Sequence, residues 1–256
     1  MKAWRGVGAA YAASYAALCA GTVDRIASAL GPSDSRRLID VGSGTGTLAA
    51  ALARAGWTVT GCEPEPTMRE IAVTQHPTLE FVPGALPELP YPDAAFDTAT
   101  ANFVLNHVPD PRAAAREMAR VAVTGAPLVA TIWTVSPSWF WAGVCERAGL
   151  TPAAGERLPP DKDFERTPPG LGQMLIDGGW HAVDISEITW TWQAHPDALW
   201  ASAEGGVASA GAFYLALDPS DRPLFRRAFD ELCDERAPGG VIALDHTAAL
   251  AIGRAR

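Results

Sequence analysis

The first half of the chain alternates short apolar runs with stretches whose apolar positions recur at helical spacing. The runs predict buried strands at 38–41, 58–62, 80–82, 96–103 and 128–133. The helical stretches are 9–30, 48–55, 65–74 and 111–121. Gly56 suits the end of the second helix, and Pro111 suits the first turn of the last. This alternation is typical of βαβ units and a parallel sheet.

The second half changes character. Residues 134–172 carry prolines at six positions without a clean period, which predicts loop and short helix (137, 152, 159, 160, 168 and 169). Residues 180–192 alternate like a strand, 196–237 indicate helices broken at Gly205–Gly206 and Pro219, and 247–253 fit a last strand. We therefore expect an α/β, Rossmann-like, seven-stranded, mostly parallel sheet with helices on both faces. A cap would cover the carboxyl ends of its strands, where ligands bind in open α/β sheets.

Charge and composition narrow the classes of partner. The net charge of −9 disfavours nucleic acid, because an acidic surface repels phosphate and no basic run exceeds two residues. Tyr11, Ser14 and Tyr15 interrupt the alanine-rich start, which argues against a signal peptide. No stretch approaches the ~20 apolar residues that span a bilayer. We expect a cytoplasmic protein without a membrane partner, and the sequence leaves its oligomeric state open.

The cysteines and histidines do not indicate a metal site. No Cys-x-x-Cys pair and no zinc-ligand spacing occurs, so free thiols in a reducing compartment are expected. The cysteines are Cys19, Cys62, Cys145 and Cys233. The histidines other than His107 are scattered (His76, His181, His195 and His246).

A glycine-rich loop between the first strand and the second helix carries the strongest chemical signal. Its residues are Gly42, Ser43, Gly44, Thr45 and Gly46. Glycines allow a tight turn and a close approach of backbone to ligand, and the helix that follows offers free N–H groups. A turn that holds no ligand is the alternative.

Spacing and charge separate the candidate ligands of this loop. Dinucleotide loops have Gly-x-Gly-x-x-Gly, and this loop is one residue shorter. Asp40, two residues before the first glycine, would repel a pyrophosphate but attract a cation. S-adenosylmethionine (SAM) carries an ammonium and a sulfonium, so Asp40 favours SAM over NAD(P). Glu63 tops the next strand, where a carboxylate accepts ribose hydroxyls; the alternative is a solvated strand-end acid.

Four motifs in this order resemble the class I SAM-dependent methyltransferases, in the small-molecule branch of the ubiquinone and menaquinone C-methyltransferases. The motifs are 38–46, Glu63–Pro64, 89–93 with Phe96–Asp97, and 102–108 with Asp110–Pro111. The resemblance is strong over about residues 35–135. It implies transfer of a methyl group from SAM to a small molecule, with S-adenosylhomocysteine (SAH) as the other product. It also implies a SAM-binding core at 1–134, cap and substrate elements at 135–240 with a core strand at about 180–192, and a last core strand at 241–256.

The resemblance assigns roles residue by residue. Asp40 and the glycine loop would hold the methionine end of SAM, and Glu63 the ribose. The expected further cofactor contacts are Pro64 and Met68 near the adenosine; Gly84, Ala85 and Leu86 along the adenine; Asn102, Phe103 and Val104 near the sulfonium; and Tyr11 and Tyr15 closing over it. Core packing is the alternative for the two tyrosines. Relatives often have an aspartate at the position of Ala85 for the adenine amino group, and its absence keeps a non-methylating SAM-binding protein open.

His107 is the expected catalytic residue, because a histidine titrates near neutrality and suits a general base. The alternative is a histidine that only lines the pocket. The acceptor would enter under the cap, where aromatic residues concentrate (Trp133, Trp139, Phe140, Trp141, Trp190, Trp192, Trp200, Phe213 and Tyr214). This lining favours a lipophilic or aromatic small molecule, and packing of the cap core is the alternative. An NAD(P)-dependent oxidoreductase is the rival reading of the whole pattern.

Overall fold

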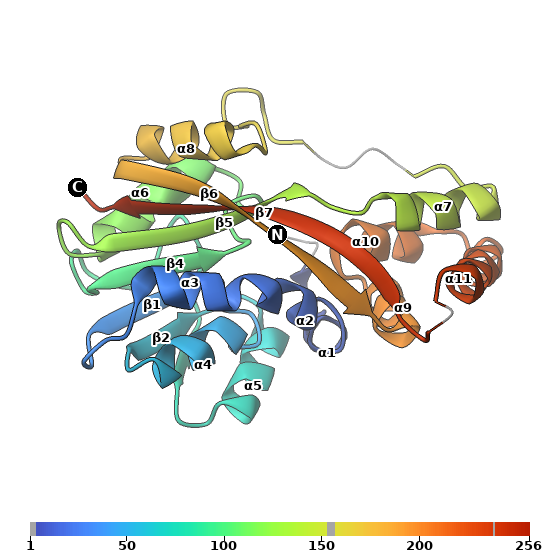
Figure 1. Ribbon diagram of the computed structural model, residues 1–256, viewed down its shortest axis with the longest axis horizontal. Helices are drawn as coiled ribbons and strands as arrows, with labels where there is room; N and C mark the ends of the chain where they lie inside the picture. The colour runs from blue at the N-terminus through green and yellow to red at the C-terminus, as the bar shows by residue number, and fades with distance from the viewer. Residues whose placement is uncertain (1–3, 153–156, 238) are drawn as a thin grey trace.

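The computed structural model describes residues 4–152, 157–237 and 239–256, and a seven-stranded sheet forms its centre (Figure 1). The strands are β1 (Arg37–Val41), β2 (Thr58–Cys62), β3 (Glu80–Val82), β4 (Thr98–Asn102), β5 (Pro127–Val135), β6 (His181–Ala194) and β7 (Ile242–Arg254). Their order is β3-β2-β1-β4-β5-β7-β6, and β7 runs antiparallel to both neighbours. The other pairings are parallel. The mostly parallel α/β sheet expected from the sequence is confirmed.

Helices cover both faces of this sheet. They are α1 (Gly8–Ala12), α2 (Tyr15–Cys19), the 3-10 turn η2 (Ala20–Thr22), α3 (Val23–Leu30), α4 (Thr47–Arg54), α5 (Pro66–Gln75), α6 (Pro111–Val121), α7 (Trp139–Ala148), α8 (Pro168–Asp177), α9 (Pro196–Glu204), α10 (Ala208–Ala216) and α11 (Arg222–Arg236). Leu38 of β1 packs in the cluster of α3 and α4, while Ile39 packs with α6 and α8. Successive strand residues point to opposite faces, so Asp40 lies on the α3 and α4 side.

The expected continuous helix at 9–30 is wrong in one respect. It is broken into α1, α2, η2 and α3, with Ser14 between the first two pieces. The hydroxyl of Ser14 donates to the carbonyl of Ala10, a back-bond that competes with regular helix geometry. The break lets the N-terminal segment bend over the carboxyl ends of the strands.

The proline-rich segment holds more helix than expected. It contains α7 and the start of α8, each ten residues long. Pro168 and Pro169 open α8, where a missing N–H costs nothing, and the Thr167 hydroxyl accepts from the amide of Gly170. α8 packs against α6 and β6, on the core sheet.

The cap grows out of the sheet itself. β6 and β7 pair along residues 181–194 and 242–254, well past the end of β5, and Figure 1 shows α7, α9, α10 and α11 gathered around this extension. β7 begins at Ile242, five residues before the strand that the alternating pattern predicted at 247–253. An aromatic and aliphatic cluster that includes Phe140, Phe225 and Phe229 holds the cap helices together. Among the described residues, no helix has both the length and the apolar content for a bilayer crossing.

Candidate functional site

The glycine loop joins β1 to α4 at the carboxyl edge of the sheet. Gly42 and Gly46 have φ of +65° and +85°, which favour glycine. A Cβ on Gly42 would lie 2.5 Å from Val104 Cγ2, and one on Gly46 would lie 2.7 Å from Phe81 Cζ. The loop therefore needs glycine for its conformation and for the space around it.

Asp40 is a buried carboxyl group with half of its hydrogen-bonding capacity unused. Its side chain is 1% exposed, and Thr100 Oγ1 donates to Oδ1 over 2.8 Å. Oδ2 has no partner among the described residues. Burial raises the pKa of Asp40 to about 7; Glu63 adds to this rise, and hydrogen bonding by Thr100 and the backbone of Ala49 opposes it. A cationic ligand would pair with Oδ2 and remove the cost of this burial.

Glu63 follows β2 and is also buried, but its carboxylate is engaged with backbone. Oε2 accepts from the amide of Gly44 over 2.9 Å, and Oε1 accepts from the amide of Glu65 over 2.8 Å. Burial raises its pKa. Each carboxylate oxygen has a second lone pair, so Glu63 can hold the loop and still accept from ribose hydroxyls.

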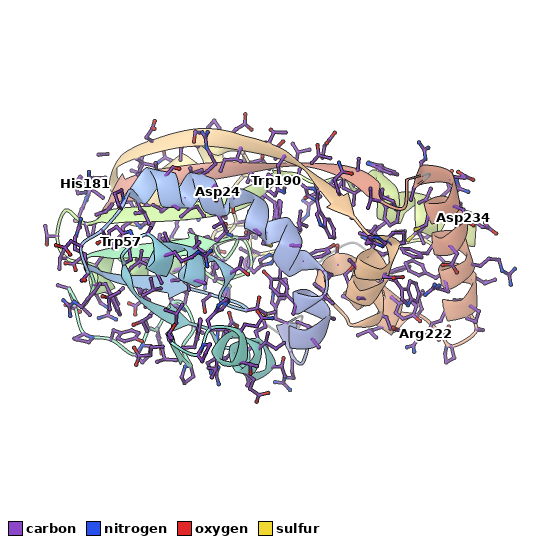
Figure 2. The ribbon with its side chains drawn as sticks, turned by 60° about the horizontal axis from the view of Figure 1, so that its bottom comes forward. Asp24, Trp57, His181, Trp190, Arg222 and Asp234 are labelled. Carbon is purple, nitrogen blue, oxygen red and sulfur yellow. The ribbon has the colours of Figure 1, made fainter. Side chains whose placement is uncertain are left out.

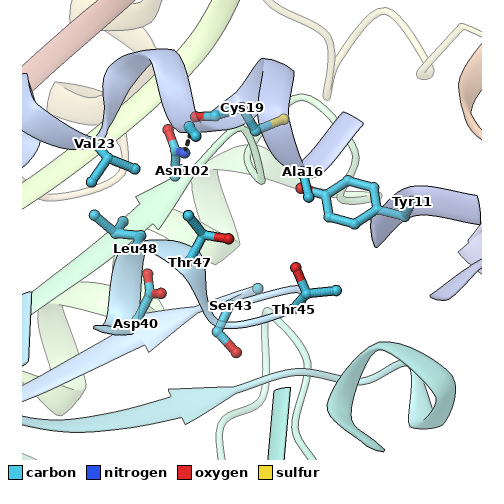
Figure 3. A pocket seen from close by; sticks show the side chains of 12 residues that line it. Tyr11, Ala16, Cys19, Val23, Asp40, Ser43, Thr45, Thr47, Leu48 and Asn102 are labelled. Carbon is cyan, nitrogen blue, oxygen red and sulfur yellow. Dashed lines mark hydrogen bonds between the residues drawn. The ribbon is translucent and has the colours of Figure 1, made fainter. Parts of the chain in front are cut away.

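A pocket of about 350 Å³ of empty space, part of it open to solvent, lies between the glycine loop and the N-terminal segment (Figure 3). The lining residues are Tyr11, Ala16, Cys19, Ala20, Val23, Asp40, Gly42, Ser43, Thr45, Thr47, Leu48 and Asn102. Ser43 Oγ, like Asp40 Oδ2, is enclosed without a partner among the described residues. The two unpartnered atoms, one of them on a carboxylate, fit the polar, cationic methionine end of SAM.

Asn102, at the end of β4, holds the N-terminal segment over this pocket. Its Nδ2 donates to the carbonyl of Cys19 over 3.2 Å, drawn as a dashed line in Figure 3. Its Oδ1 accepts from Thr22 Oγ1 and Thr131 Oγ1 over 2.8 and 2.6 Å. One amide side chain thus ties α2 and η2 to strands β4 and β5.

Several residues expected at the cofactor lie outside the walls of this pocket. Met68 is buried with Val7 and Val207 beneath the N-terminal segment, and Pro64 precedes α5. The 84–86 segment lies beyond β3, where Ala85 bridges to Glu88 and Leu86 is buried in the core. Gly44 and Gly46 belong to the loop itself, and Val104 packs on Gly42.

Two aromatic residues that were expected at the cofactor, Tyr15 and Phe103, pack against tryptophans of the cap and do not line this pocket. Tyr15 packs edge-on against Trp192 with ring centres 6.1 Å apart, and Phe103 stacks on Trp133 at 3.7 Å. Tyr11, in contrast, lines the pocket and lies beside Gly44. The structure therefore gives the two tyrosines different surroundings.

Sequence reasoning named Tyr11 on the N-terminal segment but missed the rest of the pocket wall that this segment supplies. Ala16, Cys19, Ala20 and Val23 follow the i, i+3, i+4, i+7 spacing of one helix face. These residues are small or apolar, and the same face covers the glycine loop. The periodic pattern was the available signal, but only the fold shows what the face covers.

His107 lies on the loop after β4, exposed and outside the pocket wall. Its ring packs edge-on against Trp4 at 5.1 Å, and its Nε2 lies 3.3 Å from Asn106 Nδ2.

The aromatic residues of the cap region form one continuous cluster, in which two parts can be described. Phe140, Trp141, Trp200, Phe213 and Tyr214 pack in or against the cap cluster with Phe225 and Phe229, and Trp139 is exposed. A second group lies where the cap joins the sheet, and we call it the cap-root cluster: Phe103, Trp133, Trp190, Trp192 and His246. This second group contacts the N-terminal segment through Trp190 on Gly21 and Trp192 on Tyr15.

Comparisons with known proteins agree with this geometry. Residues 39–130 match the family model described as a methyltransferase domain. A demethylmenaquinone methyltransferase of Beutenbergia cavernae is 31% identical over 176 residues, covering 63% of this chain and 72% of that protein. The enzyme of the same name from Renibacterium salmoninarum is 28% identical over 181 residues, covering 64% and 74%. The crystal structure of the YcgJ protein from Bacillus subtilis has the same fold, with a TM-score of 0.60, 19% identity and coverage of 92% and 98%.

Proposed function

The chain belongs to the class I SAM-dependent methyltransferases of the ubiquinone and menaquinone C-methyltransferase type, and we propose that its acceptor is a hydroxylated aromatic ring of the quinol class. It is a small-molecule methyltransferase that uses SAM. The names of its relatives and the aromatic cap-root cluster beside the pocket support the quinol as acceptor.

SAM supplies a methyl group bonded to a positively charged sulfur, which leaves as a neutral thioether. We propose that Asp40 Oδ2 pairs with the ammonium of its methionine end, and that Ser43, Thr45 and the loop amides bind the neighbouring polar groups. Glu63 would accept from the ribose hydroxyls, with Pro64, Met68 and residues 84–86 on the adenosine side. Tyr11 and the face of α2 and η2 would exclude water from the reacting atoms, and alignment of this kind accounts for much of the rate.

The observation that carries the cofactor assignment is the unpartnered, buried Asp40 carboxylate at a pocket wall. It disagrees with the oxidoreductase alternative, since an uncompensated acid beside the glycine loop would repel a pyrophosphate. A cationic ligand is the kind that this site stabilises.

Calorimetric titration with SAM, SAH, NAD and NADP tests the cofactor, and mass spectrometry for SAH with reduced naphthoquinones tests the reaction. We expect SAM and SAH to bind at micromolar concentration, without binding of either dinucleotide, and SAH to accumulate only with the acceptor present. Tight SAM binding without SAH formation from any quinol would refute the proposed acceptor and favour the non-methylating alternative. Preferential binding of NAD or NADP would refute the cofactor site.

The partner and location follow the same proposal. A small acceptor is expected in place of a nucleic acid, given the net charge of −9. We propose a cytoplasmic location for the protein, where its four cysteines would stay reduced.

A further inference from the structure

We infer that His246, in the cap-root cluster, is the base that takes the proton from the acceptor's hydroxyl group; this inference rests on the proposed quinol acceptor. His246 lies on the part of β7 that extends past β5, far along the chain from the methyltransferase motifs. No feature of its sequence surroundings marks it.

His246 faces inward from the cap ribbon. Its side chain is 5% exposed, and it alternates with the exposed Asp245 and half-buried Thr247. Trp190 of β6 is its cross-strand partner, and Figure 2 labels this tryptophan on β6. An inward imidazole in an apolar strand face is costly unless its nitrogen atoms find partners.

Three aromatic contacts connect His246 to the pocket. The ring centres of Trp133 and His246 lie 5.4 Å apart. Trp133 also stacks on Phe103, which follows the pocket residue Asn102 in the sequence. Trp190 stacks on His246 at 5.8 Å and packs against Gly21, which follows the pocket residue Ala20.

The third contact runs through Trp192, whose ring centre is 6.5 Å from His246. Trp192 meets Tyr15, the neighbour of the pocket residue Ala16. Each tryptophan that packs on His246 therefore contacts a residue that is next in sequence to one lining the cofactor pocket.

The hydrogen bonds of His246 leave one ring nitrogen for a ligand. Nδ1 lies 2.9 Å from the carbonyl of Leu244, which can only accept, so Nδ1 carries the proton. Nε2 then holds a lone pair, and no described residue bonds to it. Trp190 Nε1 is also enclosed without a partner among the described residues. The cluster thus holds an unused acceptor on His246 and an unused donor on Trp190, which lies against Gly21. An acceptor hydroxyl can donate to the free nitrogen of His246.

The surroundings keep His246 neutral, as a base must be. The side chains that pack on it from β5 and β6 are Trp133, Trp190 and Trp192, which do not titrate. Burial lowers its pKa, the Leu244 carbonyl and Asp245 opposing this shift, while Asp245 itself is exposed and accepts from Thr191. Tyr15, which reaches the cluster from α2, has its pKa raised by burial and stays neutral.

The step balances as follows. The acceptor's O–H bond breaks and its proton moves to Nε2, leaving the electron pair on oxygen. The ring carbon beside that oxygen bonds to the methyl carbon while the carbon–sulfur bond breaks and its electrons stay on sulfur. That ring carbon then loses its proton as aromaticity returns, the oxygen regains one, and one proton is released to solvent for each methyl group.

The test compares His246→Gln with His107→Gln and with His181→Gln, a control on the exposed start of β6. The probe is 1,4-naphthalenediol, kept reduced under anaerobic conditions, with SAM. We expect His246→Gln to lower kcat about 100-fold at pH 7, the range for loss of a general base. Its rate should rise with pH as free acceptor ionises and approach the wild-type rate near pH 10. The control should keep the wild-type pH profile.

A binding measurement separates a base from a structural residue. Quenching of tryptophan fluorescence by 1,4-naphthalenediol, in the SAH-bound protein, should give the same affinity within about threefold for wild type and His246→Gln. Trp190→Phe, which removes the indole N–H together with part of the ring, should weaken binding several-fold and leave the pH profile of kcat unchanged.

The outcomes distinguish the two proposals. A wild-type enzyme that methylates the diol while His246→Gln keeps its rate and pH profile refutes the role of His246 alone. If His107→Gln lowers kcat at pH 7 and changes its pH dependence while His246→Gln does neither, the base is His107. A wild-type enzyme that forms no SAH with the diol or with other quinols refutes the proposed acceptor, and the role of His246 with it.

Discussion

Thr100 and Asp40 lie on adjacent parallel strands, and the threonine hydroxyl donates a 2.8 Å hydrogen bond to one oxygen of the buried carboxylate. This bond fixes the direction of the carboxylate and leaves Oδ2 free toward the pocket. The position is therefore oriented before any ligand arrives, which lowers the ordering cost of binding.

Replacing Asp40 by asparagine should separate cofactor binding from stability. The amide oxygen can still accept from Thr100, but the charge is gone, so we expect SAM affinity to fall about 30- to 100-fold, the ~2–3 kcal/mol of a charged hydrogen bond. Without SAM, the variant should be more stable at pH 8 by about 2 kcal/mol, because no buried carboxylate has to ionise. Calorimetric titration and denaturant unfolding measure the two effects, with the exposed Asp34→Asn as control. Unchanged affinity would remove Asp40 from the site.

SAM affinity should depend on pH through the same group. The pKa of Asp40 is about 7 in the ligand-free protein, so the carboxylate is protonated below this value. We expect affinity to be constant above pH 8 and to fall toward tenfold per unit below pH 6. The stability of the ligand-free protein has the opposite slope: the raised pKa means that folding binds a proton between about pH 4 and 7, so stability falls as pH rises through this window. A flat affinity profile in wild type would contradict this assignment. Asp40→Asn should lose the contribution of this group to both profiles.

Asn102→Ala should loosen the cover of the pocket. The change removes bonds to the Cys19 carbonyl and to the Thr22 and Thr131 hydroxyls; the first two hold the N-terminal segment, by about 1–2 kcal/mol in sum. We expect SAM to dissociate about tenfold faster and amides of residues 15–23 to exchange faster with deuterium. Stopped-flow fluorescence and hydrogen exchange measure these rates. Thr22→Val, which removes the bond from the Thr22 hydroxyl to Asn102, should show a smaller effect. Equal exchange rates in all three proteins would refute the role of Asn102 in holding this segment over the pocket.

Gly42→Ala tests the space around the loop. The new methyl group would meet Val104 at 2.5 Å in a left-handed conformation, so we expect the variant to lose most SAM binding and about 2–3 kcal/mol of stability. Adding Val104→Ala should restore part of the stability, because it relieves the clash but not the backbone strain. Thermal unfolding of the two single variants and the double variant gives the coupling. Additive losses would show that Val104 is not the obstacle.

Trp180→Ala tests the core away from the site. The ring is fully buried against Gly253, and its N–H donates to the carbonyl of Ala115 over 2.9 Å. Removal should cost about 3–5 kcal/mol. Denaturant unfolding measures the loss, and protein that remains folded should bind SAM normally. Trp180→Phe keeps most of the volume and should cost less.

The sequence was sufficient for the parts of the fold where local pattern and burial agree. The strands from Leu38 to Trp133 are short apolar runs because they lie inside a parallel sheet. The glycine loop is recognisable from its residue types alone. The prolines at 168 and 169 led to the prediction of a loop where α8 begins, because proline is common both in loops and in the first turn of a helix.

The candidate site was only half predictable, for a tertiary reason. Asp40 and Glu63 stand beside a recognisable loop, whereas Ala16 and Cys19 become pocket walls only because Asn102 ties their segment down. The sequence around His246 predicts a loop, since Asp245 is polar, although the residues belong to the part of β7 that extends past β5. Its neighbours come from β5 and β6, which sequence spacing does not bring together.

The continuous β6–β7 ribbon also constrains how such an enzyme can diversify. Because side chains alternate along a strand, deleting a single residue between Ile242 and His246 would exchange the inner and outer faces of the cap part while the sheet keeps its register. Trp192 would then lie opposite a solvent-facing position. Descendants of this chain can therefore change the cap lining readily by point substitution or by two-residue insertions, and odd changes in ribbon length should be rare among them.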